Sequence, residues 1–526
     1  MDSYAWMGGL AGGVGLFLLG MGLMTDGLRL AAGAALERIL AQSTRTRLRG
    51  LASGVAVTAL VQSSSAVTVA AIGFVNAGLL NFRQAVWVLF GANVGTTMTG
   101  WLVALVGLQF KIEVLALPLI GVGMLMRVTA EGHRRGPAGM ALAGFGVLFL
   151  GIDLLKETFG GLSDQFQLPE GTSTTEVLVL VGMGIVLAVL MQSSSAALAL
   201  ALTAAQGGLL SAQGAAAVVI GANIGTTVTA LMAAFGATAN AKRAAAAHIV
   251  FNLLTGVVAL MLLPWLISFL TELREWLSLD AAPAAKLALF HTVFNLLGVL
   301  LIWPLATPLT QFLEARFQGA EDDQAQPRFI DKNVLAVPAL ALEALARELQ
   351  RLGATAQSAV RHAWEEAPST RLKTSRTADL LASAIATFIA QLHRSGMSQD
   401  SALRLAQLLR VARYYESAMA LAEEADLAWQ ERKSPEGVQS AWLAWRDEGE
   451  RVLVQLASAK THSEMEVQAF EVAYQKLKSE LLLAGAQGLL PVTAMDAQLR
   501  GASALRRAVE QCAKAKLVLG NLSVPV

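Results

Sequence analysis

The sequence VQSSSA at residues 61–66 is repeated as MQSSSA at residues 191–196, 130 positions further along the chain. At the same spacing, GANVGTT at residues 91–97 is repeated as GANIGTT at residues 221–227. All four stretches lie inside long apolar segments, where polar residues and glycines interrupt the hydrophobic sequence. Duplicated polar elements at membrane depth are typical of transporters that are built from two repeats around a central binding site.

The composition divides the chain into a membrane part and a polar part. Of the 526 residues, 55% are hydrophobic, which is too many for an ordinary soluble protein. Residues 177–241 contain no charged residue and no histidine, whereas a membrane-spanning helix needs only about 20 apolar residues. From residue 334 onward, leucine and alanine recur at helical spacing between charged residues. The sequence therefore predicts an all-α polytopic membrane protein that continues into a soluble C-terminal helical bundle.

The charges of the connections predict how the membrane part is oriented. Basic residues cluster at 38–49, 127–135 and 242–243, so the positive-inside rule assigns these connections to the cytoplasm. Residues 153–176 instead carry five acidic residues and Lys156 alone. This acidic loop and the first basic loop follow similar segments, GLFLLG at 15–20 and GVLFLG at 146–151. Equivalent loops of opposite charge predict two repeats of inverted topology.

Each charge-poor region around a QSSS motif is longer than one span. It can hold three spans, or a re-entrant hairpin followed by one span. We favour the hairpin because QSSS interrupts the apolar run near its middle, and irregular backbone is tolerated there only inside protein or beside a cavity. The expected domains are membrane repeat 1 at 1–136, membrane repeat 2 with an extra span at 137–317, a linker at 318–333, and the bundle at 334–526. We expect Gly8–Thr25 to be a retained first span.

The repeated motifs offer ligands for both a cation and an anion. Hydroxyl and amide oxygens can bind sodium, while the same hydroxyls and the N–H groups at a broken helix can donate to an oxyanion. We expect glycines to let the backbone break and approach closely in the GAN motifs, at Gly91, Gly95, Gly221 and Gly225. Serines in membrane helices often bond only to their own backbone, but matched duplicate motifs favour a binding site. Because no Lys or Arg lies in the motifs, an anion there would need a co-bound cation.

A weaker repeat is HIVFN at residues 248–252 and HTVFN at residues 291–295. The histidine and asparagine of each copy are four positions apart and share a helix face. Two interpretations stay open for these pairs, an interhelical hydrogen bond or a role in gating or protonation. Other features exclude whole classes: there is no basic tract for nucleic acid, and Cys512 is alone, so no disulfide framework is expected. The sequence has no nucleotide-binding loop and no paired carboxylates, so nothing in it argues for an enzyme.

At the two QSSS motifs the sequence resembles the sodium–phosphate cotransporter family, the bacterial relatives of the type II sodium–phosphate cotransporters of animal epithelia. The resemblance covers roughly residues 8–310. It implies sodium-coupled symport of inorganic phosphate by alternating access across a plasma membrane, and we expect this to be a bacterial inner membrane. By the resemblance, phosphate contacts Gln62, Ser63, Ser64, Ser65, Gln192, Ser193, Ser194 and Ser195. Sodium, the coupling ion, contacts Ser64, Asn93, Thr96, Thr97, Ser194, Asn223, Thr226 and Thr227.

The polar C-terminal part, residues 334–526, resembles a PhoU-like domain. The stretch RYYESAMA at 413–420 has alanine where the PhoU pattern has a second carboxylate, so we expect a regulatory or docking role rather than metal binding. Expected partners are therefore inorganic phosphate, membrane lipid, a cytoplasmic regulatory protein and a second copy of the chain. Two alternative functions stay open, a phosphate exporter or facilitator on the same scaffold, and a membrane phosphate sensor that signals through the bundle.

Overall fold

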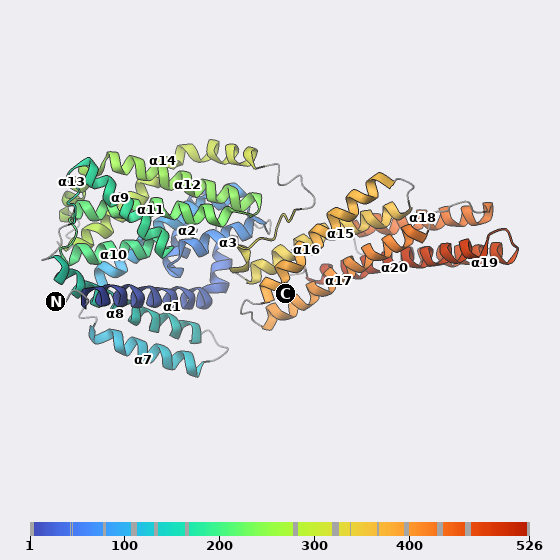
Figure 1. Ribbon diagram of the computed structural model, residues 1–526, viewed down its shortest axis with the longest axis horizontal. Helices are drawn as coiled ribbons and strands as arrows, with labels where there is room; N and C mark the ends of the chain where they lie inside the picture. Colours follow the sequence, from blue (N-terminus) through green and yellow to red (C-terminus); the bar gives the residue numbers. More distant parts are fainter. Residues whose placement is uncertain are drawn as a thin grey trace. The chain divides into compact units, whose positions relative to one another are not determined.

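The structure is a computed structural model that describes residues 5–42, 44, 46–76, 80–106, 113–130, 135–163, 168–276, 282–317, 326–336, 338–364, 368–393, 399–428, 435–457 and 464–522. The chain divides into two compact units, Met1–Gln318 and Gly319–Val526. All regular elements of the described residues are helical, as Figure 1 shows. The predicted all-α class is confirmed.

The first unit consists of apolar helices that differ in length. Its elements are α1 (Ala5–Gln42), α2 (Arg47–Val61), α3 (Ser64–Asn76), α4 (Phe82–Gly95), α5 (Thr97–Trp101), the π-helix η1 (Leu102–Val106), α7 (Glu113–Thr129), α8 (Arg135–Ser163), α9 (Thr174–Met191), α10 (Ser194–Gln206), α11 (Ala212–Ala234), α12 (Ala239–Met261), α13 (Leu263–Trp276) and α14 (Pro283–Arg316).

Seven stretches of the described residues are long and apolar enough to cross a membrane. They are Trp6–Ala32, Phe82–Ala104, Arg135–Leu162, Thr174–Met191, Ala212–Met232, Ala239–Met261 and Pro283–Arg316. Large apolar side chains also face outward from this unit; on α7, Leu117 is 66% and Val128 is 70% exposed. Exposed apolar surface of this kind is suited to lipid rather than water. The chain is therefore a multi-pass membrane protein, as predicted.

Helices α1 and α8, which the GLFLLG-like segments identify as equivalent, pack closely along their lengths (Figure 1). A methyl group added at Gly13 would meet Leu155, and one added at Gly27 would lie 2.4 Å from the backbone nitrogen of Ala141. Because higher numbers on α1 pair with lower numbers on α8, the two helices are antiparallel. Antiparallel equivalents support an inverted arrangement of the repeats, which stays a prediction.

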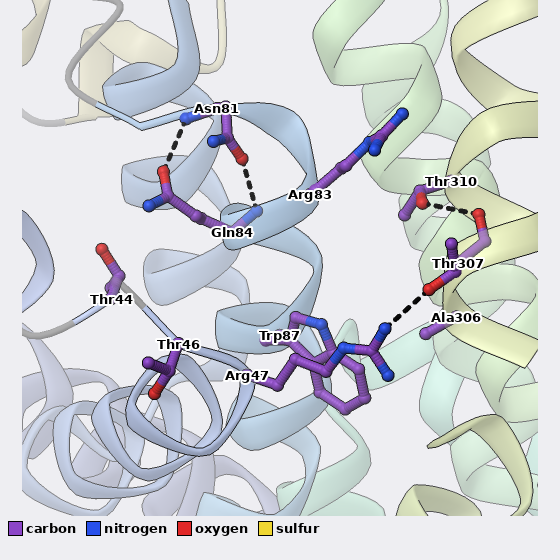
Figure 2. Close-up of a pocket in the computed structure, with 10 residues that line it drawn as sticks. All are labelled: Thr44, Thr46, Arg47, Asn81, Arg83, Gln84, Trp87, Ala306, Thr307 and Thr310. Carbon is purple, nitrogen blue, oxygen red and sulfur yellow. Dashed lines mark hydrogen bonds between the residues drawn. The ribbon is translucent and has the colours of Figure 1, made fainter. Parts of the chain in front are cut away.

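The charge-poor regions form hairpins rather than three spans. Gly50 on α2 lies against Trp87 on α4, and Thr58 lies against Gly95, so α2 and α4 run parallel. Helix α3 must then return between them, and its 13 residues extend only about 20 Å, short of a membrane of about 30 Å. The residues at the starts of α2 and α4 line one pocket, which Figure 2 shows. The re-entrant hairpin that the sequence predicts is therefore present.

The second repeat has the same hairpin. Val181 on α9 lies against Gly221 on α11, and Ala188 lies against Gly225, so these two helices are also parallel. Helix α10 returns between them and has 13 residues, as α3 does. Each repeat therefore contains a re-entrant hairpin, α2–α3 or α9–α10, followed by a helix, α4 or α11, that packs on its first arm.

The expectation that the GAN motifs break the backbone is wrong for the second copy. In the first copy the helix ends, but the chain keeps its helical direction. Helix α11 is continuous through residues 221–227. Helix α4 ends at Gly95, but Thr96 keeps right-handed helical angles, with φ −65° and ψ −19°. The close approach expected at these glycines is confirmed at Gly91, where an added methyl group would lie 2.1 Å from the carbonyl oxygen of Leu51. Small residues at such positions let two membrane helices approach at backbone distance.

The second unit is a bundle of amphipathic helices around a core of mainly leucine and alanine side chains, which includes an aromatic cluster. Its elements are the 3₁₀ turn η2 (Val334–Ala336), α15 (Pro338–Trp364), α16 (Pro368–His393), α17 (Gln399–Ala428), α18 (Glu436–Ala457), α19 (Glu464–Ala486) and α20 (Val492–Leu522). The rings of Trp364 and Trp445 meet edge to face at 5.8 Å between centroids. Likeness to PhoU and the proposed bounds of the four segments stay predictions.

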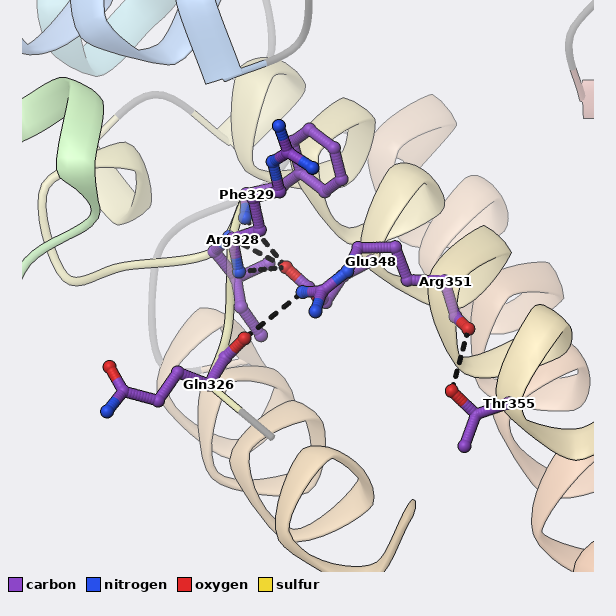
Figure 3. A network of polar contacts seen from close by, with 7 residues as sticks. Gln326, Arg328, Phe329, Glu348, Arg351 and Thr355 are labelled. Carbon is purple, nitrogen blue, oxygen red and sulfur yellow. Dashed lines mark hydrogen bonds and ion pairs between the residues drawn. The ribbon is translucent and has the colours of Figure 1, made fainter. Parts of the chain in front are cut away.

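A buried carboxylate attaches the start of this unit to the bundle (Figure 3). Glu348 on α15 is fully buried and accepts backbone N–H bonds from Arg328 at 2.9 Å and from Phe329 at 2.7 Å. It also pairs with Arg351, which donates to the carbonyl of Gln326 at 3.1 Å. A buried charge is tolerated only when it is paired and hydrogen-bonded, and this one has both kinds of partner.

Candidate functional site

The tip of the first hairpin is built by Gln62 and Ser63. Gln62 follows α2 in the left-handed conformation, with φ 57° and ψ 27°, and its backbone N–H donates to the carbonyl of Thr58. The hydroxyl oxygen of Ser63 then accepts the backbone N–H of Ala66 at 3.2 Å, which caps the start of α3. Gln62 therefore ends one helix, and Ser63 caps the start of the next.

The tip of the second hairpin repeats this geometry. Gln192 has φ 51° and ψ 27°, and the Ser193 hydroxyl accepts the backbone N–H of Ala196 at 3.1 Å. Among the described residues, Gln62 and Gln192 alone combine a side chain with a positive φ. This conformation costs a non-glycine residue about 1–2 kcal/mol, and such strain is found at functional sites more often than elsewhere.

Each tip brings together the two helix ends that ions prefer. The first N–H groups of α3 and α10 carry a partial positive charge, and the last carbonyls of α2 and α9 carry a partial negative charge. The second serines of the motifs, Ser64 and Ser194, begin α3 and α10. Ser194 and Ser195 are buried, Ser64 is half-buried, and Ser65 is exposed, so the two tips differ in access. Hydroxyl and N–H donors for an oxyanion therefore lie beside carbonyl oxygens for a cation.

Helix α5 contacts the first tip and the helix that follows the second tip, α10. The Thr99 hydroxyl donates to the Gln62 side-chain oxygen at 2.8 Å. The neighbouring residue is Gly100, and a methyl group added there would lie 3.2 Å from the Leu198 side chain on α10. Ser193 reaches α1 instead, where its hydroxyl lies 4.0 Å from the sulfur of Met21. The motifs of both repeats thus contact elements of the first repeat, without a direct hydrogen bond between the tips among the described residues.

The threonines of the GAN motifs bond to their own helices. Thr96 donates to the carbonyl of Asn93 at 2.6 Å, and Thr226 donates to the carbonyl of Asn223 at the same distance. Thr227 donates to the carbonyl of Ile224 at 2.7 Å. These bonds occupy the hydroxyl hydrogens and leave oxygen lone pairs, so the threonines can accept a cation but cannot donate to phosphate as they stand. Thr97 is buried in the first turn of α5.

The His248 pair belongs to the same region. Its Nε2 lies 3.2 Å from Oδ1 of Asn93 and 2.9 Å from Nδ2 of Asn252. A neutral imidazole with its proton on Nε2 can donate to Asn93, whereas the other tautomer can accept from Asn252, so one nitrogen serves both in turn. An interhelical hydrogen bond, one of the two interpretations of this pair, is therefore present, and a role in gating or protonation stays a prediction. In the second copy, Asn295 donates to the carbonyl of His291 at 2.9 Å.

Comparisons with known proteins identify the family of the chain. The model of a family described as Na+/Pi-cotransporter matches residues 16–157 and 166–268. YqeW of Bacillus subtilis, an uncharacterized protein, is 33% identical over 296 residues, which cover 55% of this chain and 91% of YqeW. The chain belongs to the Na+/Pi-cotransporter family.

Other relatives carry names that refer to phosphate. YjbB of Escherichia coli K12, which is named as an inorganic phosphate export protein, is 28% identical over 408 residues, or 75% of this chain and 73% of YjbB. The human sodium-dependent phosphate transport protein 2B is 35% identical over 98 residues, or 18% of this chain and 14% of that protein. No solved structure matches the chain. Membership in the Na+/Pi-cotransporter family makes the chain a transporter rather than an enzyme, with phosphate as the cargo of the family.

Sequence reasoning missed one residue at the site of this Na+/Pi-cotransporter family member. Thr99 bonds to Gln62, yet it lies two positions beyond the repeated motif. A signal was available, because the repeat extends through GTTMT at 95–99 and GTTVT at 225–229. The second copy behaves differently: Thr229 donates to the carbonyl of Thr226 at 2.8 Å and not to Gln192. The partner of a side chain cannot be read from a repeat alone.

Proposed function

We propose that the protein is a symporter that couples sodium to inorganic phosphate by alternating access. The observation that carries this proposal is the pair of matched hairpin tips, each with a left-handed Gln and a capping Ser, in a member of the Na+/Pi-cotransporter family. Hairpin arms of 15 and 18 residues extend about 22 and 27 Å, so tips that enter from opposite sides both pass the middle of a membrane of about 30 Å.

Phosphate would bind at these tips through hydroxyl and N–H donors. The proposed contacts are Gln62, Ser63, Ser64, Ser65, Gln192, Ser193, Ser194 and Ser195. Neither motif contains a Lys or Arg, so the donors alone leave a divalent anion without a compensating charge. Such a charge is costly at membrane depth. This cost supports the co-binding of a cation with phosphate.

Sodium would bind beside the phosphate through oxygen ligands. The proposed ligands are Ser64, Asn93, Thr96, Thr97, Ser194, Asn223, Thr226 and Thr227. The hydrogen bonds of Thr96 and Thr226 to their own backbones orient the hydroxyl oxygens and support this role. Because His248 lies against Asn93, its bond would set the direction of the Asn93 side-chain oxygen. No organic cofactor is part of the proposal.

The positive-inside rule supports a cytoplasmic C-terminal bundle. Arg47, Arg83 and Arg243 lie near the end of α14, where Arg47 bonds to Thr307 and Arg243 bonds to the carbonyl of Glu314. Basic residues at one end of the membrane unit assign that end to the cytoplasm. Helix α14 ends there, so the chain would enter the bundle on the cytoplasmic side of a plasma membrane. A regulatory partner and a homo-oligomer remain proposals.

A second candidate is export of phosphate by the same site. The observation that favours it is the name of YjbB, which refers to inorganic phosphate export. Direction follows from the gradients of sodium, phosphate and voltage, so one scaffold can serve either direction. Phosphate binding without any flux would instead favour a sensor that signals through the bundle.

Phosphate flux in variants of the two tips tests the shared site. Ser64→Ala and Ser194→Ala should each reduce uptake at low phosphate by about 10- to 100-fold, because a hydrogen bond to a charged group contributes about 1.5–3 kcal/mol. Ser268→Ala is the matched control, since that exposed hydroxyl bonds only to the carbonyl of Pro264. Normal uptake by either tip variant at saturating sodium would exclude one site shared by both repeats.

A further inference from the structure

A polar pocket lies at one end of the membrane unit, separate from the hairpin tips. It has a volume of about 300 Å³ and is lined by the starts of α2 and α4 and the last third of α14 (Figure 2). Its lining includes Thr46, Arg47, Arg83, Trp87, Thr307 and Thr310. Gln62 lies at the far end of α2 from Arg47, about 22 Å away along a helix of 15 residues. The pocket is therefore distinct from the proposed transport site.

Two guanidinium groups give the pocket its charge. Arg47 donates to the Thr307 hydroxyl at 2.7 Å and lies 5.6 Å from the centre of the Trp87 ring, so its position is fixed from two sides. Arg83 pairs with Glu314 on α14 at 3.0 Å, but its side chain is 55% exposed. An exposed ion pair is weak, so an anion can compete with Glu314 for Arg83. The net charge of these three side chains is +1.

Hydroxyl groups complete the donor set. Thr46 accepts the backbone N–H of Arg49 at 3.3 Å, which leaves its hydroxyl hydrogen for another acceptor. Thr310 donates to the carbonyl of Thr307 at 2.9 Å. The backbone start of α4 does not contribute, because Asn81 and Gln84 close it with a capping box. Recognition would therefore depend on the two arginines and Thr46.

The equivalent position of the second repeat has neither the charge nor the space. At the offset of 130, Arg47 corresponds to Val177 and Arg83 corresponds to Gln213. There Gln213 donates to the carbonyl of Gly171 at 2.7 Å, and the loop before α9 fills the gap. Ser211 donates to the carbonyl of Glu170 at 2.6 Å. The basic pocket is thus a feature of the first repeat alone and not a consequence of the hairpin fold.

We propose that this pocket binds a phosphate-type oxyanion between Arg47 and Arg83, as a second anion site beside the transport site. Guanidinium groups match the geometry of phosphate oxygens, and the volume is at the lower end of the range for small-ligand sites. Free phosphate and the phosphate headgroup of a lipid share this chemistry. At the end of the molecule that the basic clusters assign to the cytoplasm, the pocket would respond to cytoplasmic phosphate.

Equilibrium binding of radiolabelled inorganic phosphate to the purified full-length chain in neutral detergent tests the proposal. The Ser64→Ala/Ser194→Ala background without sodium removes the transport site from the measurement. In this background Arg47→Gln should weaken phosphate binding about tenfold, and Glu314→Gln should strengthen it, because the competing carboxylate is lost. A gain of binding cannot result from misfolding. Arg413→Gln, which removes an exposed charge from the bundle, is the control.

The outcomes separate this proposal from the proposed function. The second site is overturned if the Ser64→Ala/Ser194→Ala background binds no phosphate. It is also overturned if neither Arg47→Gln nor Glu314→Gln changes phosphate binding in that background. Normal transport by the Ser64→Ala or Ser194→Ala variant overturns the shared transport site and leaves the pocket standing. Short-chain phosphatidic acid, added at increasing concentration, identifies the source. If phosphatidic acid displaces the radiolabelled phosphate at a lower concentration than unlabelled phosphate does, a lipid headgroup is the occupant. If phosphatidic acid does not compete, free phosphate is the occupant.

Discussion

The substitution Gly91→Ala tests whether close packing between α2 and α4 positions the first hairpin. The added methyl group would lie 2.1 Å from the carbonyl oxygen of Leu51, and 3.0 Å from the backbone nitrogen of Val55. An ordinary contact between such atoms is about 3.5 Å, so the two helices must separate locally by about 1.4 Å. Overpacking of this kind costs about 1–3 kcal/mol, against a gain of up to about 1 kcal/mol in helix propensity.

The effect on transport should exceed the effect on stability. Helix α2 carries Gln62 at its end, so a shift of the helix moves the hairpin tip. Misplacement of reacting or binding groups by about 1 Å can cost about 100-fold in rate, and we expect a loss of that order in phosphate uptake. The assay is uptake by proteoliposomes, together with the midpoint of thermal unfolding in detergent.

The matched control is Gly182→Ala on α9, where no atom lies within 4 Å of the added methyl group. It should transport normally and unfold at the same or a slightly higher temperature. If Gly91→Ala also transports normally with an unchanged midpoint, then the close contact does not position the hairpin and the reasoning is wrong.

Further predictions concern His248, Cys512 and Glu348. His248→Leu leaves Oδ1 of Asn93 without its partner and should raise the sodium concentration needed for half-maximal uptake; an unchanged sodium dependence would remove His248 from the site. Burial raises the pKa of the Cys512 thiol from 9.0 to about 12, so maleimide should label it only after denaturation, and rapid labelling of native protein would contradict its burial. The thiol ionises at lower pH in the unfolded chain than in the folded bundle. Ionisation of Cys512 should therefore lower the free energy of unfolding of the bundle as the pH rises from 9 toward 12. Glu348→Ala should destabilise the bundle by about 3 kcal/mol, measured by denaturant unfolding, whereas the exposed Glu416→Ala should cost less than about 1 kcal/mol; equal effects would refute the anchoring role of Glu348.

The hairpins could be predicted because their signal is local. Polar QSSS in the middle of an apolar run requires irregular backbone, and each copy does place Gln62 or Gln192 in the left-handed conformation. For Gly91 the sequence predicts a backbone break and a close approach together, and does not show that the close approach is the role it has. A glycine permits both a backbone break and a close helix contact, and only the position of Leu51 on the neighbouring helix decides between them.

The asymmetry between the repeats also lay beyond the sequence. Thr99 and Thr229 occupy equivalent positions, but Thr99 bonds to Gln62 and Thr229 bonds to its own helix. The charge difference at the basic pocket is visible in the sequence, where Val177 and Gln213 stand in place of Arg47 and Arg83, but only the fold brings the two arginines to the lining of one pocket. Such differences arise from packing against helices outside the repeat, and a comparison of two similar segments carries no information about those neighbours.

Uptake of radiolabelled phosphate into proteoliposomes tests the central claim most directly. An inward sodium gradient is compared with an equal potassium gradient, at the same phosphate concentration on both sides. Sodium coupling predicts accumulation above equilibrium with sodium alone, and its collapse when a sodium ionophore removes the gradient. Equal, non-accumulating flux under both gradients would contradict coupling and reduce the protein to a facilitator.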